Sequence, residues 1–363
     1  MELSAIARQR LVNQRISGEK CADPAAAVRW LGALQAQDYG QALWAVGLRT
    51  QAGSRAEVEH AIARRAIVLT WPMRGTIHCV PAEDAQWMVR LLAQRPLAAA
   101  ARRRSQLGLS EQTVGRARAL VGEALAGGRC LTRAALLQVL AEAGISPQGG
   151  RGYHLLVSMA QEGLLCFGPQ QAGQQTFVLL HEWVPQPREL SRAAALAELA
   201  RRYFTSHGPA TLPDFARWAG LSLTEARQGL AASQAELVAI KLQGVSYWGP
   251  AAVAPELPEK TGVQLLPGFD EYFLGYKDRS AIIAAGQLAR ICPGGNGVFK
   301  PMLVLDGQIV GTWGKQLTKQ GLDLIVEFFA PVPELPPGLT EAARQFCQFM
   351  QLPPGTIRTS GQS

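Results

Sequence analysis

Three times along the chain, the periodicity of amphipathic helices gives way to two short runs of β-branched and aromatic residues around a turn. The clearest case lies near the start, where runs at 66–71 and 76–80 flank a turn at 72–75. Helices followed by a two-stranded hairpin are typical of a winged-helix module. This repetition constrains the fold more than any other feature, because it predicts three tandem modules of one kind.

The first predicted module contains helices at 3–12, 24–37 and 55–65. The Asp23-Pro24 pair favours the start of the second helix, because an aspartate side chain caps helices well and proline is tolerated at the first helical position. On this interpretation Gln37 lies at the end of that helix.

The second and third repeats follow the same order of helices and paired strands. In the second repeat, the predicted helices are 98–104, 110–125, 132–143 and 152–162, and the strands are 164–167 and 176–180. In the third, the predicted helices are 191–206, 211–219 and 222–232, followed by two short strands within 238–248. The repeats therefore predict a mainly helical chain.

The character of the chain changes near residue 255, where proline and glycine begin to interrupt short apolar runs. The predicted strands are 263–266, 298–306, 309–313 and 322–329. Tight turns such as Asp306-Gly307 between short strands are typical of a small barrel or sheet. We expect a closing helix at 339–352 and a frayed tail at 355–363.

The expected fold class is therefore α+β, mainly α, with three tandem winged-helix modules and a small C-terminal β-barrel. A chain of 363 residues exceeds what one hydrophobic core usually serves, which supports several domains. The predicted domains are 1–97, 98–186, 187–254 and the barrel domain 255–363.

The chain is basic, with 36 Lys and Arg against 28 Asp and Glu and a formal net charge of +8. An excess of this sign suits an acidic partner such as nucleic acid. Arginine outnumbers lysine and suits forked contacts to phosphate, although an Ala-, Arg- and Gly-rich composition can equally reflect a GC-rich genome. Hydrophobic residues make up 48% and charged residues 18%, which excludes a disordered chain.

Six cysteines are scattered along the chain without a Cys-x-x-Cys pair or a histidine placed to complete a zinc cluster: Cys21, Cys79, Cys130, Cys166, Cys292 and Cys347. We expect no metal site and no cofactor, and reduced thiols in the cytoplasm. The glycine-rich segments 144–152 and 294–297 lack the Lys-Ser/Thr of a phosphate-binding loop. No stretch resembles a signal peptide or approaches the roughly 18 apolar residues of a membrane span.

Three segments carry the strongest functional signal: LGALQAQDY at 31–39, WPMRGTIH at 71–78 and LLPGFDEY at 265–272. In this order, and over essentially the whole chain, the sequence resembles the winged-helix DNA glycosylases of the AlkZ/YcaQ type, and the stretch 270–279 is part of the resemblance. It implies a C-shaped molecule of three winged-helix units plus a terminal β-barrel. We expect a monomer whose partner is double-stranded DNA carrying alkylated bases.

The resemblance makes Gln35 and Gln37 the catalytic pair in a concave DNA-binding surface. Hydrolysis of an N-glycosidic bond passes through an oxocarbenium-like sugar, and the enzyme must hold a water beneath the anomeric carbon. A glutamine carbonyl oxygen can accept a hydrogen bond from that water and present a partial negative charge to the sugar. Taken in isolation, the two glutamines would be ordinary polar residues at a helix end.

An amide is a weak base, so this chemistry suits a purine that alkylation at N7 or N3 has already made a good leaving group. Some family members carry Asp at the second position of the pair, whereas this chain has Gln37 followed by Asp38. This departure indicates the amide branch, whose members include self-resistance enzymes against alkylating natural products. Asp38 either bonds the backbone at a helix end, pairs with an arginine or takes part in the chemistry.

Arg74 and His78 are the candidate DNA contacts of the first hairpin, because they share one face of a predicted strand with Thr76. Arg74 is the candidate for a backbone phosphate. His78 either touches a phosphate or a flipped sugar, or is a buried, satisfied histidine.

Further basic residues allow two interpretations each. Arg102 and Arg103, in a run with Arg104, form either a solvated helix face or a phosphate contact. Lys277, Arg279 and Lys300 belong to the predicted barrel region, where they contact either DNA or the protein itself.

The resulting hypothesis is a monofunctional DNA glycosylase that removes alkylated purines and extends to bulky adducts or interstrand crosslinks. We expect no lyase activity, because no lysine lies near the glutamine pair in the sequence to form a Schiff base. The alternative is a non-catalytic winged-helix DNA-binding protein or transcription regulator, a more frequent role for this fold. A regulator usually dimerises on a palindrome, and no dimerisation or ligand domain is evident in the sequence, which favours the enzyme.

Overall fold

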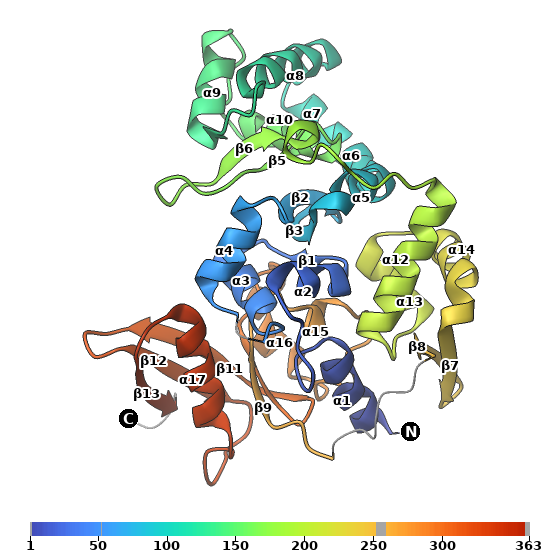
Figure 1. The fold of residues 1–363 in the computed structure, drawn as a ribbon, viewed down its shortest axis with the longest axis vertical. Coiled ribbons are helices and arrows are strands. Elements are labelled where there is room, and N and C mark those ends of the chain that lie inside the picture. The colour runs from blue at the N-terminus through green and yellow to red at the C-terminus, as the bar shows by residue number, and fades with distance from the viewer. Residues whose placement is uncertain (1, 52, 252–258, 360–363) are drawn as a thin grey trace. The chain divides into compact units, whose positions relative to one another are not determined.

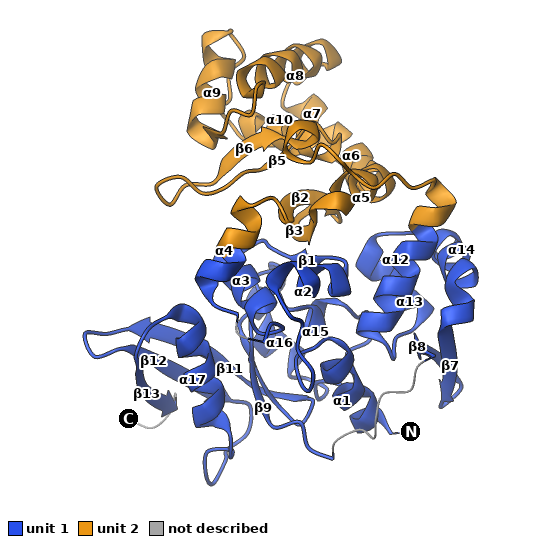
Figure 2. Ribbon diagram, in the orientation of Figure 1, with its two compact units in different colours: residues 1–58, 196–363 blue, residues 59–195 orange. Residues whose placement is uncertain are grey.

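The computed structural model describes residues 2–51, 53–251 and 259–359. The chain divides into two compact units, which Figure 2 colours separately. Unit 1 consists of residues 1–58 and 196–363, and unit 2 consists of residues 59–195. Both units combine helices with sheets, which confirms the predicted α+β, mainly helical class.

Unit 1 begins with α1 (Leu3–Asn13), α2 (Pro24–Leu31), β1 (Leu34–Gln35) and α3 (Tyr39–Gly47) (Figure 1). The predicted cap of α2 is confirmed, since the Asp23 side chain accepts a hydrogen bond from the backbone N–H of Ala26 at 2.8 Å. The predicted end of this helix near Gln37 is wrong. Helix α2 stops at Leu31 because Gly32 has a φ of 80°, a backbone angle that only glycine adopts readily.

The middle of unit 1 holds the third predicted set of helices and strands. The observed elements are α12 (Arg192–His207), α13 (Leu212–Ala219), α14 (Leu223–Ser233), β7 (Leu237–Leu242) and β8 (Val245–Pro250). Thr211 and Ser222 each form a capping box with the acidic residue three positions on, which fixes where α13 and α14 begin. Strands β7 and β8 pair antiparallel through a hairpin.

A five-stranded mixed sheet occupies the C-terminal part of unit 1. Its strands are β9 (Val263–Leu266), β10 (Met302–Leu305), β11 (Gln308–Leu317), β12 (Leu322–Phe328) and β13 (Pro354–Thr359). They lie in the order β13-β12-β11-β10-β9, so the described sheet is open with β13 and β9 at its edges. The predicted β-barrel is therefore wrong.

The tail explains part of this error, because residues 355–359 form strand β13 instead of fraying. Strand β13 pairs parallel to β12, and parallel neighbours need a long crossover connection, which α17 (Leu339–Met350) provides. Phe346 of α17 packs edge-on against Trp44 and Trp313, with ring centroids 5.0 and 4.8 Å apart. Helix α17 thus fixes the sheet to α3. The rest of the predicted tail, 360–363, lies outside the described residues.

Two short helices complete the C-terminal part of unit 1. They are α15 (Glu271–Leu274) and α16 (Leu288–Ile291). Asp270 caps α15 by accepting a hydrogen bond from the backbone N–H of Tyr272 at 2.8 Å.

Unit 2 contains the first two predicted hairpins and the helices between them. Its strands are β2 (Ile67–Met73), β3 (Thr76–Pro81), β4 (Leu131–Thr132), β5 (Leu165–Phe167) and β6 (Thr176–Leu179). Its helices are α5 (Ala85–Leu92), α6 (Gln94–Ala99), α7 (Ala101–Gln106), α8 (Glu111–Leu125), α9 (Arg133–Glu142), α10 (Arg151–Gln161) and α11 (Leu180–Trp183), while α4 (Arg55–Ala63) spans the unit boundary. Within the unit the strands lie in the order β3-β2-β5-β6-β4.

The first hairpin turns through Arg74 and Gly75, both of which have positive φ angles, 55° and 72°. Two such residues give a turn whose twist matches that of the flanking strands, so the hairpin predicted at 66–80 is confirmed. The division into four domains stays a prediction. No helix in the described ranges is both long and apolar enough to cross a membrane.

Candidate active site

The two glutamines lie in the segment that joins α2 to α3, and they have different surroundings. Gln35 belongs to β1, and only 8% of it is exposed. Gln37 and Asp38 are exposed. Asp38 caps α3, because its Oδ1 accepts a hydrogen bond from the backbone N–H of Gln41 at 3.0 Å. The segment 32–38 therefore presents one amide to solvent and holds the other inside.

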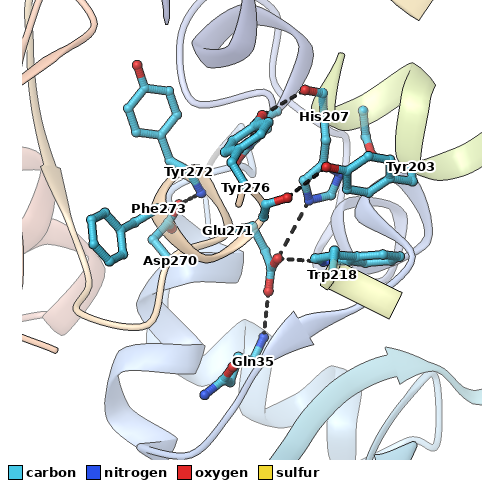
Figure 3. A network of polar contacts seen from close by, with 12 residues as sticks. Gln35, Tyr203, His207, Trp218, Asp270, Glu271, Tyr272, Phe273 and Tyr276 are labelled. Carbon is cyan, nitrogen blue, oxygen red and sulfur yellow. Dashed lines mark hydrogen bonds and ion pairs between the residues drawn. The ribbon is translucent and has the colours of Figure 1, made fainter. Parts of the chain in front are cut away.

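The backbone of Gln35 is held by the side chain of Glu271 (Figure 3). Glu271 Oε1 accepts a hydrogen bond from the Gln35 backbone N–H at 3.0 Å. The other carboxylate oxygen, Oε2, accepts one from the indole N–H of Trp218 at 2.8 Å. Glu271 is fully buried, so these hydrogen bonds replace water around its carboxylate.

His207 completes this cluster from the end of α12. Its Nε2 lies 3.6 Å from Glu271 Oε2, which is longer than a hydrogen bond, and its Nδ1 lies 2.8 Å from the Ser206 hydroxyl. Its ring stacks on Tyr203, with centroids 4.7 Å apart. Burial lowers the pKa of His207, while the Glu271 carboxylate acts in the opposite direction. The imidazole is therefore neutral at neutral pH.

A second buried cluster adjoins the first through consecutive residues of the chain. Asp270 pairs with Arg49 through two hydrogen bonds, of 2.8 and 2.9 Å, and both side chains are fully buried. Arg49 also donates to the side-chain oxygen of Gln14 at 3.0 Å. Gln14 donates to the Tyr276 hydroxyl, which donates to the backbone carbonyl of His207 at 2.7 Å. Hydrogen bonds therefore connect the two clusters.

A recess opens beside the glutamine segment, and Asp38 forms part of its lining. Its volume is about 210 Å³, and its walls include Trp44, Trp313, Phe346 and Lys315. Burial is the main cause that lowers the pKa of Lys315, and the positive charge of Arg55 lowers it further. The sequence places no lysine near the glutamine pair, whereas the fold brings Lys315 to the recess that Asp38 borders. A larger cavity of about 820 Å³ lies between α13 and β8, and none of the residues 32–38 lines it.

Arg74 and His78 form a local pair in the first hairpin of unit 2. An Arg74 guanidinium nitrogen lies 3.0 Å from His78 Nε2, and His78 Nδ1 lies 2.9 Å from the backbone oxygen of Thr76. A carbonyl oxygen only accepts, so Nδ1 carries the proton and Nε2 accepts from Arg74. His78 is fully buried, and Arg74 is partly exposed.

The other basic candidates lie on surfaces of their own unit. Arg102 and Arg103 are exposed on α7 of unit 2. In unit 1, Lys277 and Lys300 are exposed, and the Lys300 ammonium lies 3.5 Å from a Glu327 oxygen. Arg279 is partly buried: its Nε donates to the backbone oxygen of Phe273 at 2.7 Å and its guanidinium lies over the Phe273 ring.

The sequence alone did not identify His207, Trp218 or Glu271 as parts of the candidate site. The available signal was the pair Asp270-Glu271, two adjacent acids within the apolar and aromatic run LLPGFDEYFLGY. Acids are rarely buried without partners, so such a pair in a core-like run indicates buried polar contacts. Its partners could not be named, because they lie between 53 and 236 residues away in the chain.

Comparisons with known proteins identify the class of this protein. The fold matches that of Streptomyces sahachiroi DNA glycosylase AlkZ with a TM-score of 0.82 and 24% identity, covering 99% of each chain. An interstrand DNA cross-link repair glycosylase of Streptomyces sahachiroi is 28% identical over 321 residues, 84% of each chain. The family model described as DNA glycosylase AlkZ-like matches residues 28–349. The chain belongs to this AlkZ-like DNA glycosylase family.

Proposed function

We propose that this protein is a monofunctional DNA glycosylase that hydrolyses the N-glycosidic bond of alkylated purines with a water positioned by Gln35 and Gln37. Membership of the AlkZ-like family supports the reaction class. The observation that carries the assignment of residues is the structure of the segment 32–38. There the buried Glu271 carboxylate holds the backbone of Gln35, and the Gln37 amide two residues further on is exposed.

The chemistry follows from what an amide can do. The carbonyl oxygen of Gln37 accepts a hydrogen bond from the attacking water and lies with its partial negative charge toward the sugar as positive charge develops there. Neither amide is a strong base, so the substrate must bring a good leaving group. A purine alkylated at N7 or N3 carries a positive charge and meets this requirement.

We extend the proposed substrates to bulky adducts and interstrand crosslinks. The supporting observation is the name of the Streptomyces sahachiroi relative, an interstrand DNA cross-link repair glycosylase. We also propose that the helices and hairpins of both units act as three winged-helix modules, within 1–97, 98–186 and 187–254. Six basic residues are proposed to contact the DNA backbone or sugar: Arg74, Arg102, Arg103, Lys277, Arg279 and Lys300. His78 was a seventh candidate, but it is buried and both of its ring nitrogens have partners, so we propose that it orients the Arg74 guanidinium instead.

The test uses duplex DNA treated with an N7-alkylating agent, followed by alkaline cleavage of abasic sites. We expect alkali-dependent strand breaks with the wild-type protein and their loss in Gln35→Ala and Gln37→Ala. Binding without base release would overturn the enzyme assignment and favour a non-catalytic DNA-binding protein.

A separate arm tests the absence of lyase activity. Strand cleavage without alkali, or a covalent adduct trapped by borohydride, would contradict a monofunctional enzyme, since a Schiff base needs a lysine amine. Lys315 is the residue to examine, because it lines the recess beside Asp38. Loss of such an adduct in Lys315→Met would identify it as the amine.

A further inference from the structure

We propose that Glu271 is a positioning residue for the candidate active site: its buried carboxylate holds the backbone of Gln35 and thereby fixes where the exposed amide of Gln37 lies. This inference rests on the proposed function. It gives a role to the segment LLPGFDEY at 265–272. This segment is part of the family resemblance, but the proposed reaction with Gln35 and Gln37 assigns it no task.

The Glu271 carboxylate bridges two buried N–H groups. Each oxygen of Glu271 accepts a hydrogen bond from a different N–H group, the Gln35 backbone at 3.0 Å and the Trp218 indole at 2.8 Å. Figure 3 shows the carboxylate between these two donors, with His207 beside it. A carboxylate held at both oxygens cannot rotate away from Gln35 without losing a buried hydrogen bond.

The buried position of the Glu271 carboxylate carries an energetic cost. Glu271 is fully buried, and an ionised carboxylate in that position is unfavourable unless hydrogen bonds and charges compensate for it. An apolar side chain there would avoid this cost but would leave the N–H groups of Gln35 and Trp218 without their acceptor. The buried carboxylate therefore performs a task that apolar packing cannot perform, which is to accept the backbone N–H of Gln35.

The short segment that contains Glu271 also contacts the glutamine region at two further points. The backbone N–H of Gly268 donates to the side-chain oxygen of Gln41, at the start of α3. Asp270 pairs with Arg49, just after the end of α3. Residues 268–271 thus contact Gln35 before α3, Gln41 in its first turn and Arg49 just after its end. These contacts fix the loop that carries Gln37.

The backbone around Gln35 has little regular secondary structure of its own to hold it. Strand β1 has only two residues, and the helix before it ends at Leu31. Gln37 lies two residues beyond Gln35, so a movement of the Gln35 backbone also changes the position of the Gln37 amide. A misplacement of a catalytic group by about 1 Å can cost roughly 100-fold in rate.

The main test is Glu271→Gln, which keeps the size and removes the charge. The donors of Gln35 and Trp218 face different oxygens of the carboxylate, so an amide in its place must turn its NH₂ group toward one of these donors and lose that hydrogen bond. We expect the single-turnover rate of base release to fall about 100-fold, while the Kd for alkylated duplex stays unchanged. Trp218→Phe, which leaves the bond to Gln35, should lose less.

Asp84→Asn in unit 2 is the matched control. Asp84 is also fully buried, accepts a hydrogen bond from an indole N–H, that of Trp87 at 2.6 Å, and lies near an arginine. The same chemical change there should leave the rate of base release near that of the wild type at a temperature well below both unfolding transitions.

Hydrogen exchange provides a readout that does not depend on activity. The Gln35 amide should exchange faster in Glu271→Gln than in the wild type and stay protected in Asp84→Asn. Unchanged protection of Gln35, a rate equal to that of Asp84→Asn, or a parallel loss of DNA affinity would each overturn the positioning role. An inactive wild-type protein would instead overturn the proposed function, so the two failures are distinguishable.

Discussion

The guanidinium of Arg49 and the carboxylate of Asp270 form a doubly hydrogen-bonded ion pair in which neither side chain is exposed to solvent. Removing one partner would leave the other charge buried without compensation. We predict that Asp270→Ala lowers the free energy of unfolding of unit 1 by about 3–5 kcal/mol. Urea unfolding of the full chain, followed through the unit 1 transition, measures this loss.

The exposed pair between Arg290 and Glu327 is the control for this prediction. Its side chains are 35% and 40% exposed, so solvent screens the interaction. We expect Glu327→Ala to cost less than about 1 kcal/mol. A similar loss of unfolding free energy in Asp270→Ala and Glu327→Ala would show that the buried ion pair matters no more for stability than the exposed one.

Gln37 should be important for the reaction and unimportant for the fold. Its side chain is exposed, so Gln37→Ala should change stability by less than about 0.5 kcal/mol. Loss of one preorganised polar group in an active site typically lowers the rate about 100- to 1000-fold, and we expect an effect of this size on base release. Gln348→Ala, an exposed glutamine of α17, is the matched control and should be as active as the wild type.

Most helices and hairpins could be predicted from the sequence because local residues determine them. Asp23 and Thr132 cap the helices that follow them, and the turn at Arg74-Gly75 fixes the first hairpin. The α2–α3 break was missed, because Gly32 ends a helix whose hydrophobic pattern continues through Leu34. The open sheet was missed for another reason: strand β13 exists only because it pairs with β12, which local propensity does not show.

The residues of the candidate site also fall into two groups, those proposed from the sequence and those that only the fold connects. The two glutamines and Asp38 could be proposed from the sequence because they lie in one short segment that carries the family resemblance, and their catalytic role stays a prediction. Glu271, Trp218 and His207 could not be linked to them, because Glu271 reaches Gln35 across 236 residues. Lys315 was missed for the same reason, since only the fold places it in the recess with Asp38.

Gly268 should tolerate no side chain. A Cβ atom there would lie 2.0 Å from the backbone oxygen of Phe299 and 2.7 Å from the Gln41 side-chain oxygen. Gly268→Ala must therefore displace the backbone at Phe299 or at position 268, and we expect a cost of about 1–3 kcal/mol in the unit 1 transition. Gly314→Ala, where a Cβ meets open space, is the control. Equal stability of Gly268→Ala and Gly314→Ala would contradict the close approach of the Gly268 and Phe299 backbones.

Acidification should destabilise unit 1 through His207. Burial holds the pKa of His207 below its ordinary value of 6.5, so below that pH the unfolded chain binds a proton that the native state refuses. Stability is therefore lost as the pH falls from about 6.5 toward the native pKa. Urea unfolding at pH 7.5 and 5.5 should show a smaller loss in His207→Gln than in the wild type. An equal loss in both would mean that other groups cause the acid sensitivity.

Arg102 and Arg103 should contribute to DNA affinity through phosphate contacts, and salt dependence measures this directly. Each phosphate neutralised on duplex DNA adds about 0.9 to the slope of log K against log salt. Both side chains are exposed on α7, so we predict that Arg102→Ala with Arg103→Ala reduces the slope by about 1.8 units on any sequence.

Lys300→Ala should reduce the slope less, because Glu327 already lies 3.5 Å from the Lys300 ammonium and partly neutralises it. Arg344→Ala, which removes an exposed arginine paired with Glu341, controls for the change in net charge. If the double variant kept the wild-type slope, α7 would be a solvated helix face, and the phosphate contacts of unit 2 would have to come from other residues such as Arg74.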